Sequence, residues 1–394
     1  LDEVADSLYY GKSGVVFMPE RKELGFRSGL SGTISNFSLT HKLPKRVKKR
    51  LPEYGVWTWQ ALMNALDNAG LEPDLFQGNV KSGVILGNDS SAVAAVEQVE
   101  QLKKFKESRY IGSGHIFQLL NSTLTLNFAT ILGIAGTSMT LSCACASGGA
   151  AIAHGAELIL KGDLDIAICG GAQEISWESM CSFDALGAFS IREDEPEKAS
   201  RPFDKERDGL VPSGGAAVVI LESEDHAQAR GADILASVKG SGYFCDGSHV
   251  SLPSGKGLKN AALAALKSAG FAPSDIDLVM AHATSTPLGD EVEAKVIKEI
   301  FSISQKGQGP VICATKALTG HEFWMAGASQ VIYAILMAKK GFVAGNVNFS
   351  EPDPEAEWLN IPATSLEMSI RKILCNSSGF GGTNSVLALQ IESD

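Results

Sequence analysis

The chain has 394 residues, of which 44% are hydrophobic and 20% are charged, a composition typical of an ordinary folded protein without disordered or collagen-like bias. Its formal net charge of −11 argues against broad binding to nucleic acid or to anionic membranes, because such binding requires a positive field. A single hydrophobic core usually stops growing below this chain length, so we expect two core units or one very large α/β domain.

The seven cysteines are odd in number and scattered, and most lie within apolar runs. This usage is typical of a reducing cytosol rather than of a disulfide framework, so we expect a cytoplasmic protein. No apolar run approaches the roughly 18 residues that a membrane span requires, and the first residues lack the pattern of an export signal. The sequence therefore predicts no membrane partner, no nucleic-acid partner and no metal site.

In the first half of the chain, apolar periodicity predicts helices over residues 2–10, 59–66 and 92–103, with the second of these ending at Gly70. Short buried strands are expected at residues 84–86, 139–141, 165–169 and 216–221, and a loop at residues 17–43. The nearly uncharged stretch 117–134 predicts a helix and a strand, packed either in an ordinary core or against a second subunit.

The second half repeats this alternation of strands and helices. Strands are expected at residues 234–238, 278–281, 310–314, 373–376 and 386–390, and helices at residues 257–269, 289–301 and 325–339. The pattern predicts two α/β units with mainly parallel central strands, divided into residues 1–232 and 233–394. In such sheets, functional sites gather at the carboxyl ends of the strands.

Cys145 lies between the strand predicted at residues 139–141 and a following helix. Its thiol is expected to face the unpaired N–H groups and the positive end of that helix, which favour the thiolate. A lone cysteine is more often a small buried residue. However, His282 and His321 each follow a predicted strand, and one cysteine with two distant histidines is typical of a nucleophile site whose members converge in the fold.

These residues stand in motifs that resemble the elongating β-ketoacyl-acyl carrier protein synthases (type I/II) of fatty acid synthesis, condensing enzymes of the thiolase superfamily. The resemblance covers nearly the whole chain and implies a thiolase-like α/β fold, in which two similar halves form layers in the order α-β-α-β-α. Family members carry a strand before the segment matching residues 1–14, so we expect this sequence to lack that first strand. The matching segments are Ser142-Cys143-Ala144-Cys145-Ala146-Ser147, residues 196–204, Arg207-Asp208-Gly209, His282-Ala283-Thr284-Ser285-Thr286-Pro287, residues 316–321 and residues 376–384.

The resemblance implies an acyltransferase that condenses an enzyme-bound acyl group with malonyl-acyl carrier protein, releasing carbon dioxide and giving 3-oxoacyl-acyl carrier protein. Cys145 would carry the acyl group, and His282 and His321 would donate from Nε2 to the enolate oxygen left by decarboxylation. Lys316 and Glu293 would form a charged support for the histidines. No cofactor is implied, because phosphopantetheine arrives on the carrier protein.

The same resemblance implies further roles around the acyl group. The backbone N–H groups of Cys145 and Phe380 would form an oxyanion hole, and Phe380, between glycines, would gate the acyl pocket. Thr284 and Thr286 would hydrogen-bond the amides of the pantetheine arm.

The resemblance also implies two protein partners, a second copy of the chain in a homodimer and the acidic acyl carrier protein. Arg46 and Lys49 belong to the densest basic cluster of an otherwise acidic chain and fall where the family meets its carrier protein. A solvated basic face is the alternative interpretation of this cluster.

Some positions depart from the family pattern. Ala283 replaces a usual glycine, Ser378 a common phenylalanine, and Gln330 an acid that usually accompanies the lysine. Residues 322–325 replace a small, flexible segment. These changes leave the cysteine and both histidines in place, so they bear on substrate range more than on reaction type.

Two alternative functions remain open from the sequence. A thiolase acting on coenzyme A thioesters would use a second cysteine as an acid, and Cys375 could play that part, although the paired histidines favour the decarboxylating synthase. A non-catalytic chain-length partner subunit would typically lack the nucleophile that Cys145 provides.

Overall fold

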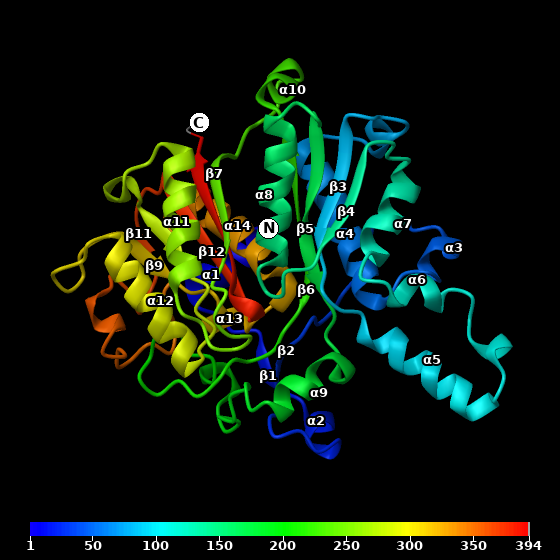
Figure 1. Cartoon of the computed structure of the whole chain (residues 1–394), viewed down its shortest axis with the longest axis horizontal. Helices are drawn as coiled ribbons and strands as arrows, with labels where there is room; N and C mark the ends of the chain where they lie inside the picture. Colours follow the sequence, from blue (N-terminus) through cyan, green and yellow to red (C-terminus); the bar gives the residue numbers. More distant parts are fainter. Residues whose placement is uncertain (393–394) are drawn as a thin grey trace.

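Two β-sheets carry the fold of this computed structural model, which describes residues 1–392 (Figure 1). The first sheet has the order β4-β3-β5-β6, with β3 at Ser82–Gly87, β4 at Thr137–Leu141, β5 at Ile166–Gln173 and β6 at Gly215–Glu222. The second has the order β7-β13-β12-β8-β9, with β7 at Ala236–Cys245, β8 at Leu278–Met280, β9 at Val311–Cys313, β12 at Lys372–Gly379 and β13 at Thr383–Ile391. The division of the chain after residue 232 stays a prediction.

The two sheets repeat one topology. β3 pairs in parallel with β4 and β5, and β5 pairs antiparallel with β6. In the same way, β8 pairs in parallel with β9 and β12, and β12 pairs antiparallel with β13. β7 adds an antiparallel edge strand beside β13, for which the first sheet has no counterpart within residues 1–392. The predicted parallel central strands are confirmed, and β4 and β9 occupy corresponding places.

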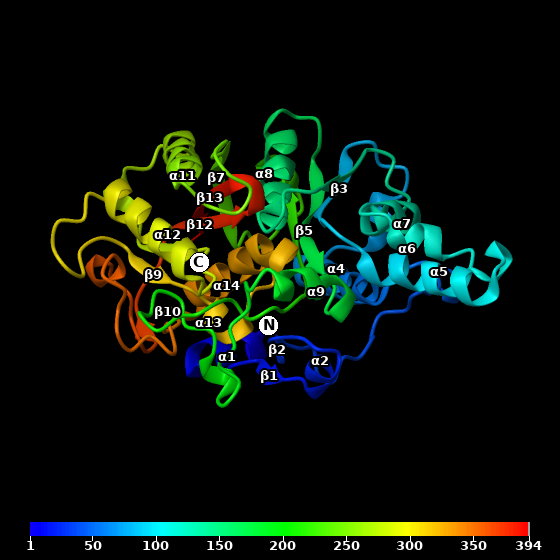
Figure 2. The ribbon, with the colours of Figure 1, turned by 60° about the horizontal axis from the view of Figure 1, so that its bottom comes forward.

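A pair of helices fills the space between the sheets, as the turned view shows (Figure 2). These are α8, Ser147–Leu160, and α14, Ala326–Lys340. Where they meet, a Cβ atom on Gly327 would lie only 2.5 Å from the backbone nitrogen of Gly149, so the close approach requires glycine. The consequence is a direct main-chain contact between the two halves of the sequence.

Outer helices cover the other face of each sheet. α4, Glu53–Ala69, and α7, Thr123–Leu132, pack on the first sheet, and α11, Lys256–Ala269, and α12, Pro287–Ile300, pack on the second. The neighbouring residues Val84 and Ile85 of β3 belong to the outer and the central core respectively, because successive side chains of a strand point to opposite faces. Both faces are thus covered, which gives the predicted α-β-α-β-α layers.

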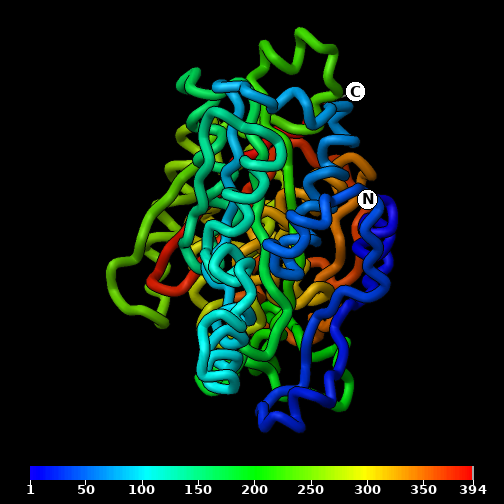
Figure 3. The backbone as a smooth tube through the Cα atoms, turned by 90° about the vertical axis from the view of Figure 1, so that its right-hand side faces the viewer, coloured from blue at the N-terminus to red at the C-terminus, as the bar shows by residue number. Residues whose placement is uncertain are grey.

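The remaining elements are short or lie at the periphery. The N-terminal segment (blue) runs along one side of the molecule (Figure 3), where the Tyr9 ring of α1 contacts Phe342, with ring centres 5.1 Å apart. No helix within residues 1–392 is long and apolar enough to cross a lipid bilayer. These elements are α1 Asp2–Tyr10, β1 Val15–Phe17, α2 Pro19–Glu23, β2 Leu30–Gly32, α3 Lys45–Lys48, η1 Pro73–Phe76, α5 Ala92–Phe105, η2 Ser108–Tyr110, α6 His115–Leu119, α9 Trp177–Ala185, η3 Pro196–Lys198, α10 Glu224–Ala229, η4 Pro273–Asp275, α13 Lys316–Thr319, η5 Phe323–Met325, β10 Phe342–Val343, η6 Ala356–Trp358, β11 Leu366–Glu367 and η7 Phe380–Gly382.

Three local predictions were wrong. The strand predicted at residues 139–141 is present but is not buried, because β4 lies at the edge of its sheet and Met139 is 40% exposed. Residues 17–43 are not only loop, because β2 pairs with β1 and α2 lies between them. Residues 117–134 contain the end of α6 and the whole of α7, and no strand. Polar side chains that resemble a strand pattern instead bond within the helix, since Asn127 Nδ2 donates to Thr123 O at 2.8 Å and Thr130 Oγ1 donates to Leu126 O at 2.7 Å.

Candidate active site

Cys145 lies in a tight turn between β4 and α8. The preceding residue, Ala144, has a φ of 49°, a left-handed conformation that is costly for any residue with a Cβ atom. Ser147 fixes the turn, because its Oγ accepts from the N–H of Cys143 at 2.8 Å and donates to the carbonyl of Ala144 at 2.5 Å. The turn presents Cys145 at the inner end of a cavity, with 7% of the residue exposed.

Burial determines the protonation state of this thiol. It raises the pKa of Cys145 to about 12, against the opposing charge of Lys316, while the nearby Asp89 adds to the rise. The backbone N–H at this position lowers the pKa, in the direction that the sequence analysis predicts for a helix end, but desolvation is the larger effect. At neutral pH the sulfur carries its proton and requires an acceptor before it can attack a carbonyl.

His321 supplies an acceptor in direct contact with the sulfur. Its Nε2 lies 3.1 Å from Cys145 Sγ. Burial, together with the charge of Lys316, lowers the pKa of His321 well below its ordinary value, so the imidazole is neutral. The ring stacks on Phe323 with centres 4.7 Å apart, and its backbone N–H donates to Val211 O at 2.6 Å, so both the ring and its main chain are held.

His282 lies beside His321, with the two ring centres 5.2 Å apart and the rings nearly perpendicular. The carboxylate of Glu293 holds the main chain at this point, accepting from the N–H of His282 at 2.9 Å and of Ala283 at 2.7 Å. Asn376 Nδ2 donates to the same carboxylate at 3.0 Å. Burial, Lys316 and His321 all lower the pKa of His282 well below its ordinary value, so this imidazole is also neutral.

One cavity of about 430 Å³ connects these groups. The hydroxyls of Thr284 and Thr286 lie 3.0 Å apart on its wall. Lys316, Arg46 and Lys49 do not line it. Lys316 is buried and acts on both histidines through its charge, while the other two are exposed on and next to α3. The predicted site residues that the structure brings to this cavity are Cys145, His282, Thr284, Thr286, Glu293, His321 and Phe380.

Phe380 stands at the cavity on a glycine-rich turn. Gly381 and Gly382 have φ values of 75° and 70°, and Phe380 itself is 40% exposed. Its ring stacks on Phe183 with centres 5.6 Å apart. Thr383 Oγ1 donates to the carbonyl of Cys143 at 3.0 Å, which ties this turn to the nucleophile turn.

Several cavity residues were missed by the sequence analysis. Phe183 belongs to α9, a helix that was not predicted, although Met180 and Phe183 have the spacing of a helical apolar face. His249 lies in the loop 246–253, whose place at the cavity has no signal in the local sequence. Asp208 stands in a matched motif but had no assigned role.

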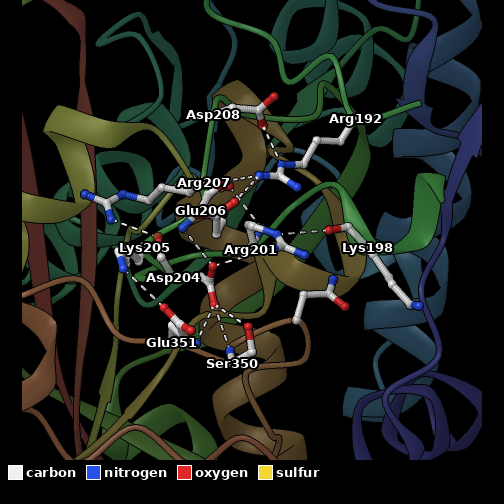
Figure 4. Close-up of polar contacts among 12 residues, drawn as sticks. Arg192, Lys198, Arg201, Asp204, Lys205, Glu206, Arg207, Asp208, Ser350 and Glu351 are labelled. Carbon is white, nitrogen blue, oxygen red and sulfur yellow. Dashed lines mark hydrogen bonds and ion pairs between the residues drawn. The ribbon is translucent and has the colours of Figure 1, made fainter. Parts of the chain in front are cut away.

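Side chains of the charged segment 199–209 contact one another and residues 350 and 351 (Figure 4). The segment also fixes the turn that carries the two threonines. Ser285, with a φ of 70°, accepts at its Oγ from the N–H of Arg201 at 3.0 Å and at its carbonyl from the N–H of Gly209 at 3.1 Å. Arg207 Nε donates to Thr286 O at 3.1 Å. The segment is anchored in turn by Asp204, whose carboxylate contacts residues 350 and 351.

Comparison with known protein families places both halves of the chain. Residues 1–227 match the family described as the N-terminal domain of β-ketoacyl synthase, and residues 235–350 match the C-terminal domain.

Individual relatives match along nearly the whole chain. The sequence is 35% identical to 3-oxoacyl-[acyl-carrier-protein] synthase 1 of Escherichia coli strain K12, covering 98% of this chain and 94% of that protein. It is 36% identical to the protein of the same name from Haemophilus influenzae, with the same coverage.

Solved structures agree with these sequence relatives. A β-ketoacyl synthase from Burkholderia phymatum STM815 has a TM-score of 0.93 at 29% identity, covering 100% of this chain and 95% of that chain. A type II polyketide ketosynthase, AntDE, solved with its acyl carrier protein AntF and a bound hexaketide, has a TM-score of 0.89 at 29% identity, also covering 100% and 95%.

Proposed function

The chain belongs to the β-ketoacyl synthase family, and from that premise we propose that it condenses an enzyme-bound acyl group with malonyl-acyl carrier protein. The reaction releases carbon dioxide and yields 3-oxoacyl-acyl carrier protein, in the elongation of a fatty acid or polyketide chain. The observation that carries the proposal is the contact of Cys145 Sγ with His321 Nε2 at 3.1 Å, beside His282 in one cavity.

In the first step, Cys145 takes the acyl group from its carrier. His321 Nε2 accepts the thiol proton, and the sulfur attacks the thioester carbonyl. The bond to the pantetheine sulfur breaks, and that sulfur leaves with the proton. The backbone N–H groups of Cys145 and Phe380 would hold the oxyanion that forms in between.

In the second step, malonyl thioester loses carbon dioxide and leaves an enolate. His282 and His321 donate to its oxygen from Nε2, which neutral imidazoles can do. The enolate carbon attacks the acyl carbonyl, forming the new carbon-carbon bond. The bond to Cys145 breaks, and the sulfur leaves as a thiolate that takes up a proton from solvent, which restores the resting thiol. Within the described residues, no hydrogen bond fixes Nδ1 of either ring, so each proton can sit on either nitrogen and His321 can serve in both steps.

Replacement of the three residues tests these roles. Cys145→Ala should abolish condensation, and His282→Ala or His321→Ala should reduce carbon dioxide release from malonyl-acyl carrier protein by about 100-fold or more. The measurement is release of labelled carbon dioxide, with Cys181→Ala, an exposed cysteine outside the cavity lining, as the control. Condensation by the Cys145→Ala variant at the rate of the wild type would refute the assignment.

The alternative functions receive no support from the site. Cys375 is buried in β12 and does not line the cavity, so it does not supply a thiolase acid there. The nucleophile that a non-catalytic partner subunit would lack is present in Cys145. Release of carbon dioxide also separates a synthase from a thiolase, which has no malonyl substrate.

We propose a homodimer formed across the first sheet. β4 is the outermost strand of that sheet and leaves one row of backbone groups unpaired by any strand within residues 1–392, with Met139 exposed on it. The apolar side chains of Ile116 and Phe117 on α6 are exposed as well. A sedimentation coefficient of a monomer at micromolar concentration would refute this arrangement.

The remaining expectations concern the cell and the carrier. We propose that the protein works in a reducing cytosol, supported by its seven free cysteines. We also propose that it needs no cofactor of its own and that phosphopantetheine enters on the carrier protein, held by Thr284 and Thr286. Full activity of the purified protein with defined acyl and malonyl carrier substrates, in the presence of a chelator, is the expected result.

A further inference from the structure

The sulfur of Cys145 has functional neighbours on two sides. His321 Nε2 lies 3.1 Å from it on one side. On the other, the cavity leads past the hydroxyls of Thr284 and Thr286 to Leu288 at the surface. The first side is needed for the reaction of the malonyl group and the second for the pantetheine arm. An acyl group on Cys145 therefore has to lie on the remaining side of the sulfur.

That remaining side is filled by apolar side chains. The buried members of the cluster around Cys145 are Phe26, Met180, Phe189, Leu210, Phe323 and Trp324. The partly buried Phe183 packs against them, with its ring centre 4.8 Å from that of Phe323 and 6.4 Å from that of Trp324. Phe183, Leu210 and Phe323 line the cavity, whereas the other members lie behind its wall. The cavity therefore ends at an aromatic wall near the sulfur.

Trp324 is the largest side chain behind this wall and is 6% exposed. Its indole Nε1 donates to Ser90 Oγ at 3.2 Å. Ser90 belongs to the loop after β3, where the N–H of Asn88 donates at 3.1 Å to the carbonyl of Leu141, the last residue of β4. β4 leads directly into the nucleophile turn. The indole therefore fills the space at the carboxyl ends of β3 and β4, beside the turn that carries Cys145.

The main chain of Trp324 is held as closely as its ring. Its carbonyl oxygen would lie 3.0 Å from a Cβ atom on Gly148, in the first turn of α8, and 2.9 Å from a Cβ atom on Gly171 of β5. Contacts this close leave the main chain no room to approach the first sheet further. Rotation of the side chain would break its buried hydrogen bond to Ser90. Trp324 is thus a fixed wall and not a gate.

We propose that Trp324 is a specificity-determining residue that limits the acyl group on Cys145 to short chains, such as acetyl and butyryl. The inference rests on the proposed function for Cys145 and names the substrate class of that site. A longer chain would have to displace the indole or turn back into the space of the pantetheine arm. It would then lose the benefit of burial, which is about fourfold in affinity for each methylene group.

The rate of acyl transfer to Cys145 tests the length limit. The protein is incubated with acetyl-, butyryl-, octanoyl- or decanoyl-acyl carrier protein, and the mass of the intact protein reports the acyl group bound. The wild type should accept decanoyl at least about tenfold more slowly than butyryl. Trp324→Ala should raise the ratio of the decanoyl rate to the butyryl rate about tenfold or more, because it opens an apolar space beside the sulfur. Trp324→Phe, a smaller ring, should give a smaller rise.

Trp59→Ala is the matched control for the loss of a buried indole. Trp59 is 4% exposed and packs on Phe128 in the outer core of the first sheet, away from the cavity lining. This variant should also unfold at lower urea concentration than the wild type, but its ratio of decanoyl to butyryl rates should be unchanged. A rise as large as that of Trp324→Ala would overturn the proposal, because general loosening of the fold would then explain both.

Two further outcomes would overturn the proposal. One is a wild type that accepts decanoyl as fast as butyryl, and the other is an unchanged ratio in the folded Trp324→Ala variant. If Trp324→Ala does not fold, the ratio in Trp324→Phe decides by the same criterion. A wild-type chain that takes up no acyl group from any of these carriers would refute the proposed function instead.

Discussion

Burial, more than any single neighbour, determines the charge of the reacting side chains. It raises the pKa of Cys145 and lowers the pKa of His282, His321 and Lys316. The result is a neutral thiol in contact with a neutral imidazole, with one cation behind them. A neutral imidazole has one nitrogen that accepts a proton and one N–H that donates a hydrogen bond. This suits a site that first activates a sulfur and then stabilises an enolate.

The two buried histidines make the protein sensitive to acid. Their folded pKa values lie below the value of about 6.5 in the unfolded chain, so below that pH the unfolded chain binds more protons. The free energy of unfolding should then fall with decreasing pH, by about 1.4 kcal/mol per pH unit for each histidine. Urea unfolding at about pH 7.5 and about pH 5.5 measures the loss.

His282→Gln and His321→Gln are the matched variants for this prediction. Each removes one titrating group, so on acidification each should lose less free energy of unfolding than the wild type. The difference should be about 1.4 kcal/mol per pH unit, the contribution of one histidine. Raised carboxyl pKa values, such as that of Asp290 at about 7, act in the opposite direction in all three proteins and cancel in the comparison. Equal losses in wild type and variants would contradict the prediction.

At the scale of elements, the segment 199–209 holds the turn at residues 284–286 in place through hydrogen bonds. It contributes little regular structure, yet it bonds the Oγ and the carbonyl of Ser285 and the carbonyl of Thr286. Asp204 anchors it from a fully buried position, accepting from the N–H groups of Ser350 at 2.7 Å and Glu351 at 3.0 Å (Figure 4). The placement of the threonine hydroxyls therefore depends on a carboxylate outside the cavity.

Asp204→Ala should destabilise the protein by about 3 to 5 kcal/mol, because it leaves buried N–H groups and Arg201 without their acceptor. It should also raise the KM for carrier substrates as the turn loosens. Lys205→Ala is the control, since its ion pair with Glu351 has side chains 60% and 67% exposed, and such pairs contribute about 1 kcal/mol or less. Chemical unfolding and steady-state kinetics on both variants measure these effects. Equal stability of the two variants would contradict the role of Asp204 as the anchor of the segment 199–209.

The regular elements were largely predictable, because apolar periodicity shows which faces are buried. The helices that end at Gly11 and Gly70 do so with φ values of 66° and 65°, as glycine at a helix end predicts. The β1–β2 pair was not predicted, because strands of three residues are too short to show periodicity. Their pairing also depends on the tertiary structure and not on the local sequence. Cys145, His282 and His321 could be singled out from their motifs. The raised pKa of Cys145 could not, because desolvation depends on the whole fold.

At the scale of the whole molecule, the two halves contribute different parts of one site. Cys145 follows β4 in the first sheet and His321 follows β9 in the second, at corresponding places of the repeated topology. The outer surface is acidic overall, with a formal charge of −11, so an acidic partner needs a local basic patch. Arg46 and Lys49 lie exposed in such a patch, away from the cavity lining.

Charge reversal of that patch tests the docking prediction. Arg46→Glu with Lys49→Glu should raise the KM for acyl carrier protein substrates about tenfold or more and weaken the salt dependence of the rate, since paired charges steer the encounter. Alkylation of Cys145 by iodoacetamide should be unchanged, because the cavity is intact. Lys267→Glu, an exposed residue on α11, is the control. An unchanged KM in the double variant would remove the patch as the docking site.

The glycine contact between α8 and α14 has a consequence for the geometry of the reaction. Gly149 of one half and Gly327 of the other touch through their main chains, a few residues from Cys145 and from His321. The distance between the Cys145 sulfur and the His321 imidazole therefore depends on a contact between two backbones, with no flexible side chain between them that could adjust. Changes of side-chain rotamer do not alter this contact. A methyl group added at Gly149 or Gly327 would push α8 and α14 apart and so change that distance.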